Sequence, residues 1–363
     1  MKYSEGYLLD NRYLLERFIG SGTFGEVWVA VDKATDLEVA VKVYVSMDEK
    51  GLEEFKKEFQ ISFELNHTNL LHANYLGVNS EDKRPYLVMP FCPDGSVTKF
   101  AGEMKEADLW RFIRDVASGL AYLHSKQPPI IHQDIKPDNI LIIKNGDFVI
   151  TDFGISRQLR ATLRKSATSM SSAGAISYMG PERFSKQYQA VKASDIWSLG
   201  VSIFELATGE LPFCGMGGSL LKQGADMPEL PEEYSPIMNM VCQSCMAKEP
   251  WSRPTAQQLA DYAARYIEGE NPKITWDKTG ELAAKLAGEN VQEPQTAPSN
   301  QMNQTVAMNA VPVSTPQFVA ADVPPQPAFN TPSAPASSGK SYLPWIISAV
   351  AGLVTGILIN LFV

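Results

Sequence analysis

The sequence predicts an α+β fold with two lobes, a small β-rich lobe followed by a larger α-helical lobe. Residues 1 to about 90 contain short apolar and β-branched runs separated by glycines, a pattern typical of strands. From about residue 91 to residue 268, apolar residues recur at helical spacing between loops rich in Pro, Gly, Asp and Asn. Beyond about residue 269 the composition changes, and no further packed lobe is expected.

The first lobe is expected to hold short strands around one helical stretch. Residues 52–65 are predicted to be helical, because Phe55, Phe59 and Phe63 recur every four residues and therefore share one helix face. The strands are predicted from near-alternating apolar residues at 13–18, 27–31 and 38–45.

The second lobe is expected to be built from helices joined by polar loops. The short apolar runs 140–143 and 147–150 are predicted to pair as a hairpin. The helices are predicted at 107–125, 190–208 and 255–267.

The C-terminal part of the chain is predicted to contain a linker at 269–342 and a membrane-spanning helix at 343–363. Between residues 294 and 342 the only charged residues are Asp322 and Lys340, and Pro, Gln, Ala, Ser, Thr and Asn dominate. Such a stretch lacks the apolar residues that offset the entropy of folding. Residues 343–363 carry no charge. As a helix they are long enough to cross a bilayer core of about 30 Å.

Charge and cysteine content narrow the classes of partner and compartment. A net charge of −9 lacks the basic surface of nucleic-acid-binding proteins, so no nucleic-acid partner is expected. Four cysteines in 363 residues are too few for a disulfide framework, which favours a reducing compartment. The spacing Cys242-x-x-Cys245 is interpreted as core packing rather than a metal site, because no second pair lies nearby.

A glycine-rich motif, GSGTFG at 20–25, is the first candidate for phosphate binding. Glycines allow backbone N–H groups to approach phosphate oxygens closely. A dinucleotide-binding fold would open a helix inside the motif, whereas here β-type residues continue at 27–29. This favours a hairpin covering a ligand, with an ordinary hairpin turn as the alternative.

Polar residues in two later loops are the second candidate site. Asp134 and Asn139 lie before the predicted hairpin, and Asp152 follows it. Carboxylate and amide oxygens are the ligands that Mg²⁺ prefers beside substrate phosphates. Lys42 ends a strand-like run, VAVK, although most lysines are simply solvated surface charges.

These segments, together with MGPE at 179–182 and DIWSLG at 195–200, resemble the motifs of eukaryotic-type (Hanks-type) Ser/Thr protein kinases in their usual order. The resemblance covers residues 13–267, with the first lobe ending near residue 90. The linker and tail make the chain similar to bacterial membrane-anchored members. The implied ligands are ATP and Mg²⁺, and the implied partners are proteins with Ser or Thr acceptors.

The resemblance implies a role for each matching residue. The backbones of Gly20, Gly22 and Gly25 would cover the phosphates. In the hinge between the lobes, Met89 would be the gatekeeper, Pro90 would offer its carbonyl to adenine, and Cys92 its N–H. The residues implied to sandwich the adenine are Ile19, Val27, Ala40 and Leu141.

The resemblance also implies the chemistry. Asp134 would accept the proton of the incoming hydroxyl, and Lys136 would neutralise charge on the transferred phosphoryl group. Lysine at position 136 is typical of the serine/threonine enzymes. Lys42 would bind the α- and β-phosphates and pair with Glu58, with Glu54 as the second choice. The metal ligands would be Asn139 and Asp152.

Four positions depart from the family pattern. Gln133 replaces the arginine before the catalytic aspartate, which makes this a non-RD catalytic loop. Ala175 lacks a hydroxyl that would bridge Asp134 and Lys136, and Ser62 weakens an apolar stack between the lobes unless Phe63 substitutes. Gly180 is a mild change, and Glu182 is still expected to form a buried pair with Arg253.

Two classes of function stay open at this stage. The first is an active kinase anchored in the cell membrane by one helix, with its catalytic domain in the cytoplasm. The second is a pseudokinase that serves as an ATP-binding or scaffolding module. Small residues recurring every four positions in the tail, including Gly352 and Gly356, raise the further hypothesis of a homodimer.

Overall fold

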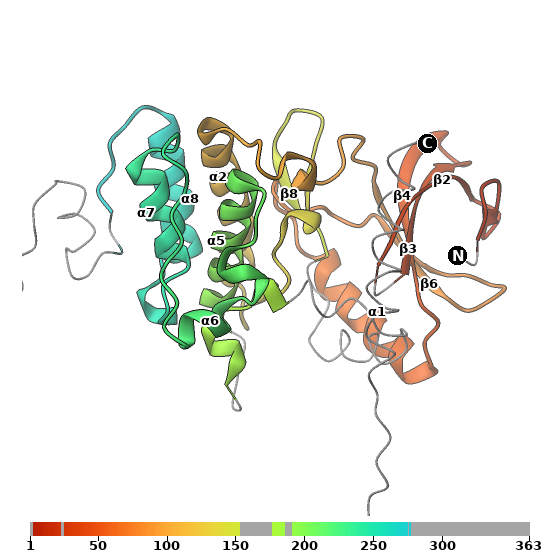
Figure 1. Cartoon of the computed structure of the whole chain (residues 1–363). Coiled ribbons are helices and arrows are strands. Elements are labelled where there is room, and N and C mark those ends of the chain that lie inside the picture. The colour runs from red at the N-terminus through yellow and green to blue at the C-terminus, as the bar shows by residue number, and fades with distance from the viewer. Residues whose placement is uncertain (1–2, 23–24, 153–175, 186–190, 275, 277–363) are drawn as a thin grey trace, which may run out of the picture. The chain divides into compact units, whose positions relative to one another are not determined.

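The computed structural model describes residues 3–22, 25–152, 176–185, 191–274 and 276. Strands β2, β3, β4 and β6 gather at one end with helix α1, and helices α2, α5, α6, α7 and α8 lie at the other, with strand β8 between them (Figure 1). The predicted two-lobed α+β architecture is therefore confirmed for these residues. The expected membrane span at 343–363 lies outside the described residues, among which no helix is long and apolar enough to span a membrane.

The first lobe is a six-stranded antiparallel sheet with strand order β1-β2-β3-β4-β6-β5. Its core lies on one face, where alternate residues such as Trp28, Val41 and Tyr86 are buried. The strands are Leu8–Leu9 (β1), Tyr13–Gly22 (β2), Gly25–Asp32 (β3), Leu37–Tyr44 (β4), Tyr75–Val78 (β5) and Pro85–Pro90 (β6).

Side chains near the N-terminus reach the opposite edge of this sheet. The Asn79 amide, beyond β5, donates to the hydroxyl groups of Tyr3 at 3.0 Å and Tyr7 at 3.3 Å. Those hydroxyls in turn donate to Asp82 and Glu81. The two edges of the sheet are thus joined by polar contacts between residues more than 70 positions apart in the chain.

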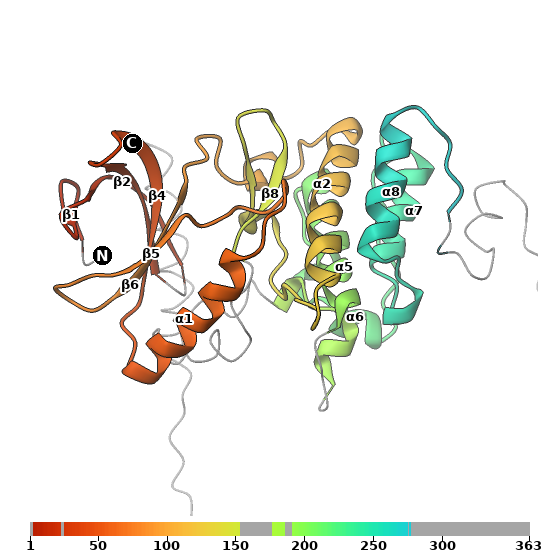
Figure 2. The same cartoon turned by 180° about the vertical axis from the view of Figure 1, so that it is seen from behind.

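Helix α1, Glu49–Phe63, is the single helix of the first lobe in the described residues and is visible beside the sheet in Figure 2. Its phenylalanines differ in burial. Phe55 is buried and its ring lies 4.6 Å from the ring of Tyr44, whereas Phe63 is half exposed. The predicted helix is confirmed, and its apolar face meets the sheet through Phe55 in the middle of the helix.

The second lobe packs helices around α2, Glu106–His124, and α5, Lys192–Thr208. Gly200 on α5 allows close approach, because a Cβ atom there would lie 2.7 Å from the Cβ atom of Cys245. Cys242 and Cys245 are both buried, as the interpretation as core residues requires, and burial raises the pKa of each thiol. The other α-helices of this lobe in the described residues are Gly218–Lys222 (α6), Pro236–Cys245 (α7) and Ala256–Ile267 (α8).

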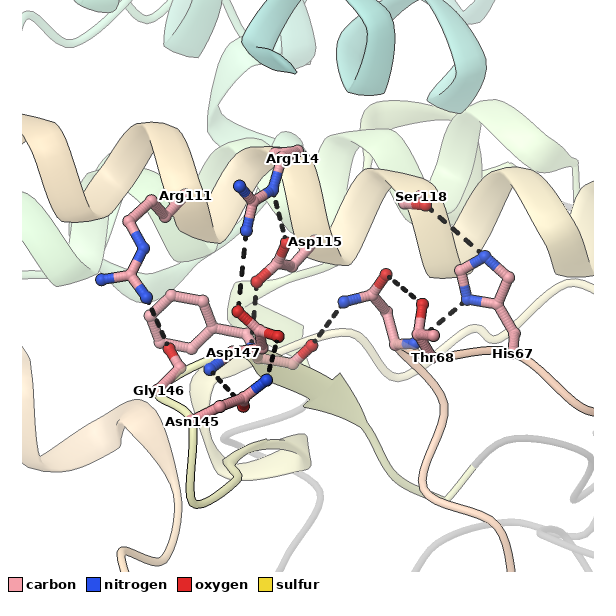
Figure 3. Close-up of polar contacts among 11 residues, drawn as sticks. His67, Thr68, Arg111, Arg114, Asp115, Ser118, Asn145, Gly146 and Asp147 are labelled. Carbon is pink, nitrogen blue, oxygen red and sulfur yellow. Dashed lines mark hydrogen bonds and ion pairs between the residues drawn. The ribbon is translucent and has the colours of Figure 1, made fainter. Parts of the chain in front are cut away.

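The predicted hairpin is confirmed as β7, Ile140–Ile142, paired with β8, Phe148–Ile150. Figure 3 shows how polar side chains join it to α2 and to the segment after α1. Asp115 on α2 accepts from the Phe148 N–H at 3.1 Å, and the Asn69 amide donates to the Phe148 carbonyl at 3.0 Å. Asp152 lies two residues after the end of β8. These hydrogen bonds hold β8 in place and therefore help to position Asp152.

The end of the second lobe extends past the expected start of the linker at residue 269. Trp276 is buried, and its ring lies 5.3 Å from the ring of Tyr262 on α8. Ile274 also packs against the core of this lobe. The polar composition of the surrounding sequence conceals these apolar contacts.

Candidate active site

A cavity of about 690 Å³ lies between the two lobes, a volume within the range of about 300–1,000 Å³ that small-molecule sites occupy. Its walls come from strands of the first lobe, the segment after β6, and the loops on both sides of the β7–β8 hairpin. The residues singled out from the sequence that line it are Ile19, Gly20, Gly25, Val27, Ala40, Lys42, Met89, Pro90, Cys92, Asp134, Lys136, Asn139, Leu141 and Asp152.

Two further candidates are not among the lining residues. Gly22 pairs with Gly25 at the end of the glycine hairpin, and the side chain of Glu58 lies outside the described residues. Several other residues line the cavity that were not singled out from the sequence; some, such as Ser21 and Asp138, lie inside the motifs, and others, such as Arg17 and Leu71, lie outside any motif. Together, these other residues are Arg17, Ser21, Leu71, Phe91, Pro93, Gly95, Ser96, Asp138 and Thr151.

The glycine motif forms the end of the antiparallel β2–β3 hairpin, as expected, since Gly20 pairs with Val27 and Gly22 with Gly25. The chain continues as strand β3 rather than as a helix, so the dinucleotide-binding alternative is wrong. A Cβ atom on Gly25 would lie 1.9 Å from the Val43 carbonyl oxygen on β4. Glycine at this position is therefore a steric requirement of the hairpin's packing.

The inner wall of the cavity is apolar. Met89 on β6 pairs with Ala40 on β4, and both pack with Leu71, Cys92 and Val149 in one small cluster. Burial raises the pKa of the Cys92 thiol, which keeps it neutral. An apolar slot edged by the backbone after β6 suits a flat aromatic base.

Lys42 lies on strand β4, as the strand-like run VAVK predicts. Its side chain reaches the opposite lobe. Its ammonium nitrogen is 2.6 Å from Asp152 Oδ1 and 2.5 Å from Oδ2. The ring of Tyr44 lies 5.4 Å from the same nitrogen. The side chains of both expected helix partners, Glu58 and Glu54, lie outside the described residues, so Asp152 is the carboxylate that the structure places on Lys42.

The loop before β7 brings three polar side chains together. The Asn139 amide donates to the Asp134 carbonyl at 2.7 Å and to its carboxylate at 3.1 Å. Lys136 Nζ lies 3.8 Å from Asp134 Oδ2. Asp134 is thus an acceptor held beside a cation at the edge of the cavity, a suitable position for a general base.

Asp195 on α5 holds the backbone of this loop through hydrogen bonds. Its carboxylate is fully buried and accepts from the backbone N–H of His132 at 2.9 Å, from that of Gln133 at 2.7 Å, and from His124 Nε2 at 2.9 Å. Burial opposes its charge, but the bond from His124 and the backbone donors outweigh burial and lower the pKa of the carboxyl group. A buried charge therefore fixes the backbone immediately before Asp134.

His132 connects this loop with the loop that carries Asp152. Its Nδ1 accepts from the Asp134 N–H at 3.3 Å, and its Nε2 donates to the Thr151 carbonyl at 3.0 Å. The Thr151 N–H donates to the Asn139 carbonyl at 2.9 Å. The candidate base and the candidate metal ligands therefore belong to one hydrogen-bonded unit.

The expected buried pair beyond the site is confirmed. Arg253 Nη1 and Nη2 lie 3.0 and 2.8 Å from the two carboxylate oxygens of Glu182. The Arg253 side chain is 0% exposed and that of Glu182 is 15% exposed. Burial opposes the Glu182 charge, but the bond from Arg253 outweighs it and lowers the pKa of the carboxyl group.

Three features of the sequence analysis fall on parts that the structure leaves undescribed: the side chain of Ser62, and residues Phe153 and Ala175. Phe63, the alternative member of the apolar stack, packs its ring 5.2 Å from His72.

The donor set fits the expected ligands. Asn139 uses its amide nitrogen to bind Asp134, which leaves its carbonyl oxygen to a cation, and Asp152 supplies a carboxylate. Oxygen ligands of this kind are what a hard divalent cation takes beside phosphates. Lys42 and the backbone of the glycine hairpin face the same cavity as these ligands.

Comparison with known proteins agrees with this geometry. The protein kinase domain profile matches residues 13–263. Among similar proteins is the serine/threonine-protein kinase PrkC of Bacillus subtilis, 31% identical over 81% of this chain and 49% of PrkC. Another is the serine/threonine-protein kinase PknA of Mycobacterium tuberculosis, 31% identical over 74% of this chain and 64% of PknA.

A plant relative is also similar. Mitogen-activated protein kinase kinase kinase 3 of Arabidopsis thaliana is 33% identical over 68% of this chain and 41% of its own length. The chain therefore spans less than two thirds of the length of each of these relatives.

Proposed function

The chain belongs to the protein kinase family, and on this premise we propose that it transfers the γ-phosphoryl group of ATP to Ser or Thr hydroxyls of proteins. One observation carries the proposal: Lys42, Asp134, Asn139 and Asp152 line a single cavity with an apolar inner wall. The serine/threonine-protein kinase names of its relatives support the class of acceptor.

In this proposal the apolar slot holds adenine, and the backbone of residues 90–92 supplies its hydrogen bonds. Lys42 binds the α- and β-phosphates while the glycine hairpin covers them. Asn139 and Asp152 would hold Mg²⁺, which would supply positive charge to offset that of the phosphates. Because Lys42 contacts Asp152 in the structure, a bound cation would compete with the lysine for that carboxylate.

The transfer step uses Asp134 and Lys136. Asp134 accepts the proton of the acceptor hydroxyl as its oxygen forms a bond to the γ-phosphorus. The bond between the γ-phosphorus and the β–γ bridging oxygen breaks, and ADP leaves with the bonding electrons. Lys136, 3.8 Å from the Asp134 carboxylate, stabilises the negative charge of the phosphoryl group in transit.

The test is incubation of the purified full chain, in detergent, with Mg²⁺, labelled ATP and a generic protein substrate. We expect labelled phosphoserine or phosphothreonine, loss of labelling when EDTA removes Mg²⁺, and a loss of at least about 100-fold in Asp134→Asn. Labelling that persists in Asp134→Asn would refute the assignment of the base.

A second candidate, a pseudokinase that binds ATP without transfer, is favoured by the bidentate contact of Lys42 with Asp152 and by Gln133. In that case the full chain binds ATP in a direct binding assay, and labelling stays at the level of Asp134→Asn. ATP binding together with Asp134-dependent labelling rules this candidate out.

The proposal extends to location and assembly, which rest on sequence alone. The 21 uncharged residues 343–363 would anchor the chain in the cell membrane, with residues 13–267 in the cytoplasm, where ATP and reduced cysteines occur. Deleting 343–363 should move the protein from the membrane fraction to the soluble fraction. Finding the full chain in the soluble fraction would contradict the anchor.

A homodimer through this helix would bring two catalytic domains together. Gly352 and Gly356 permit close approach of two helices. Replacing both with isoleucine keeps the segment apolar and should lower the crosslinked dimer fraction in membranes. An equal dimer fraction in the double variant and the parent would contradict this assembly.

A further inference from the structure

Gln133, the residue before Asp134, has a strained backbone. Its φ angle of 65° lies in the left-handed region, which residues other than glycine adopt only when their surroundings hold them there. Asp134 follows directly, so the conformation of Gln133 decides how the Asp134 side chain is aimed. The contacts that maintain this conformation therefore bear on catalysis.

The two peptide groups that flank Gln133 are each held by hydrogen bonds. The N–H of Gln133 donates to Asp195, as described above. In the peptide group that joins Gln133 to Asp134, the N–H donates to His132 and the carbonyl accepts from Arg183 Nη1 at 3.2 Å. Arg183 thus contacts, from outside the loop, the peptide group that joins Gln133 to Asp134. These contacts use the backbone of Gln133 and not its side chain.

Arg183 projects from a firmly held element, the 3₁₀ helix Pro181–Phe184. Its neighbour Glu182 forms the buried pair with Arg253. On the other side, Gly218 at the start of α6 packs so closely that a Cβ atom there would lie 2.2 Å from the Pro181 nitrogen. The guanidinium group therefore extends from an anchored helix toward the catalytic loop.

We propose that Arg183 is a positioning residue that orients Asp134 through the backbone carbonyl of Gln133. A charged donor makes a stronger hydrogen bond to a carbonyl than a neutral one does. Because Arg183 belongs to the 3₁₀ helix Pro181–Phe184, the placement of this helix is coupled to Asp134. The coupling needs no arginine at position 133, since it uses a main-chain oxygen. This inference rests on the proposed kinase activity of the same site.

The kinetic test compares the full chain with Arg183→Met, which removes the donors, and Arg183→Lys, which keeps a cationic donor. We expect Arg183→Met to lower kcat on the order of 10-fold with the KM for ATP within about twofold. Arg183→Lys should recover most of the loss. Arg265→Met is the matched control and should leave kcat unchanged, because Arg265 is exposed, pairs with Glu270 and is not among the residues that line the cavity.

A second readout does not depend on activity. Amide hydrogen exchange of peptides covering residues 130–136 should become faster in Arg183→Met and not in Arg265→Met. If kcat and exchange are both unchanged in Arg183→Met, or if kcat falls while exchange stays the same, the proposal is wrong. If the parent chain shows no labelling at all, the proposed function fails, and the exchange result alone still decides whether Arg183 holds the loop. If Arg183→Met does not fold, Arg183→Gln carries the same comparison.

Discussion

Lys42 on the strand side of the cavity and Asp134 on the helical side are held in different ways. Lys42 is fixed by Asp152, a residue of the opposite lobe that is itself a candidate metal ligand. Asp134 is fixed by its own loop, which is anchored to the fully buried Asp195. Asp134 is therefore preorganised by the fold, whereas the position of Lys42 depends on one side chain of the opposite lobe.

This difference indicates which residues should affect stability and which should affect activity alone. A buried carboxylate with three donors cannot lose its charge without leaving polar groups unpaired in the core. The contact between Lys42 and Asp152 is partly exposed, with side chains 11% and 21% accessible, so water can replace part of it. Substitutions on the helical side should thus lower the stability of the fold strongly. Substitutions on the strand side should lower stability less and mainly reduce activity.

The largest effect on stability is expected at Asp195. Asp195→Asn removes the charge and at least one acceptor from a fully buried site, so the free energy of unfolding should fall by roughly 3–5 kcal/mol. Activity should fall with it, because the His132 and Gln133 backbone loses its anchor. Urea unfolding measures the first effect, and Asp261→Asn on the exposed face of α8 is the control. A change below about 1 kcal/mol would contradict the comparison.

The next effect is expected at the Arg253–Glu182 pair. Arg253→Met leaves the Glu182 carboxylate without its bidentate partner and should cost about 2–3 kcal/mol. The Glu182 pKa is lowered in the folded protein, so its stabilising contribution is present above the unfolded-state pKa and is lost as the pH falls through the folded-state value. Arg253→Met should therefore also flatten the loss of stability in acid. If the free energy of unfolding of Arg253→Met falls with decreasing pH as steeply as that of the parent, Glu182 is not the source of this pH dependence.

A smaller effect on stability, with a large effect on activity, is expected at Lys42. Lys42→Met should change the free energy of unfolding by about 1–2 kcal/mol and lower phosphoryl transfer by at least about 100-fold. Lys56→Met, on the exposed face of α1, is the control for loss of a surface lysine. If Lys42→Met lowers the free energy of unfolding as much as Asp195→Asn does, the strand side is no more tolerant of substitution than the helical side.

The sequence predicted the residues that line the cavity better than the long-range contacts that support them. The cavity residues were identifiable because each motif is local, such as the glycine turn at 20–25 or the loop containing Asp134 and Asn139. Strands on both sides of the glycines correctly predicted a hairpin, since β-type residues leave no room for a helix there. The long-range contacts that hold the loops in place were harder to predict. Contacts such as Arg183 with Gln133, or Tyr3 with Asn79, join residues 50 or more positions apart and leave no local pattern.

The boundary of the second lobe shows the same limit. Polar residues after 267 predicted a linker from 269, yet Trp276 packs on Tyr262. One aromatic side chain can extend a packed lobe without altering the average composition of the segment around it. Composition detects whole domains better than single anchoring residues.

The smallest expected effect concerns His67, in the segment between α1 and β5. Its Nε2 lies 3.5 Å from Ser118 Oγ on α2 (Figure 3). The ring of Tyr122, also on α2, lies 5.0 Å from the His67 ring. Burial, with a smaller contribution from Lys126, lowers the pKa of His67 below the ordinary value of 6.5. The folded protein therefore binds fewer protons than the unfolded chain just below that pH, and stability should decline as the pH falls through about 6.5 toward the folded-state pKa. His67→Gln removes the titrating group and should make this decline shallower. Urea unfolding between about pH 7.5 and pH 5.5 measures it, and equal slopes in the parent and His67→Gln would show that His67 contributes no pH dependence.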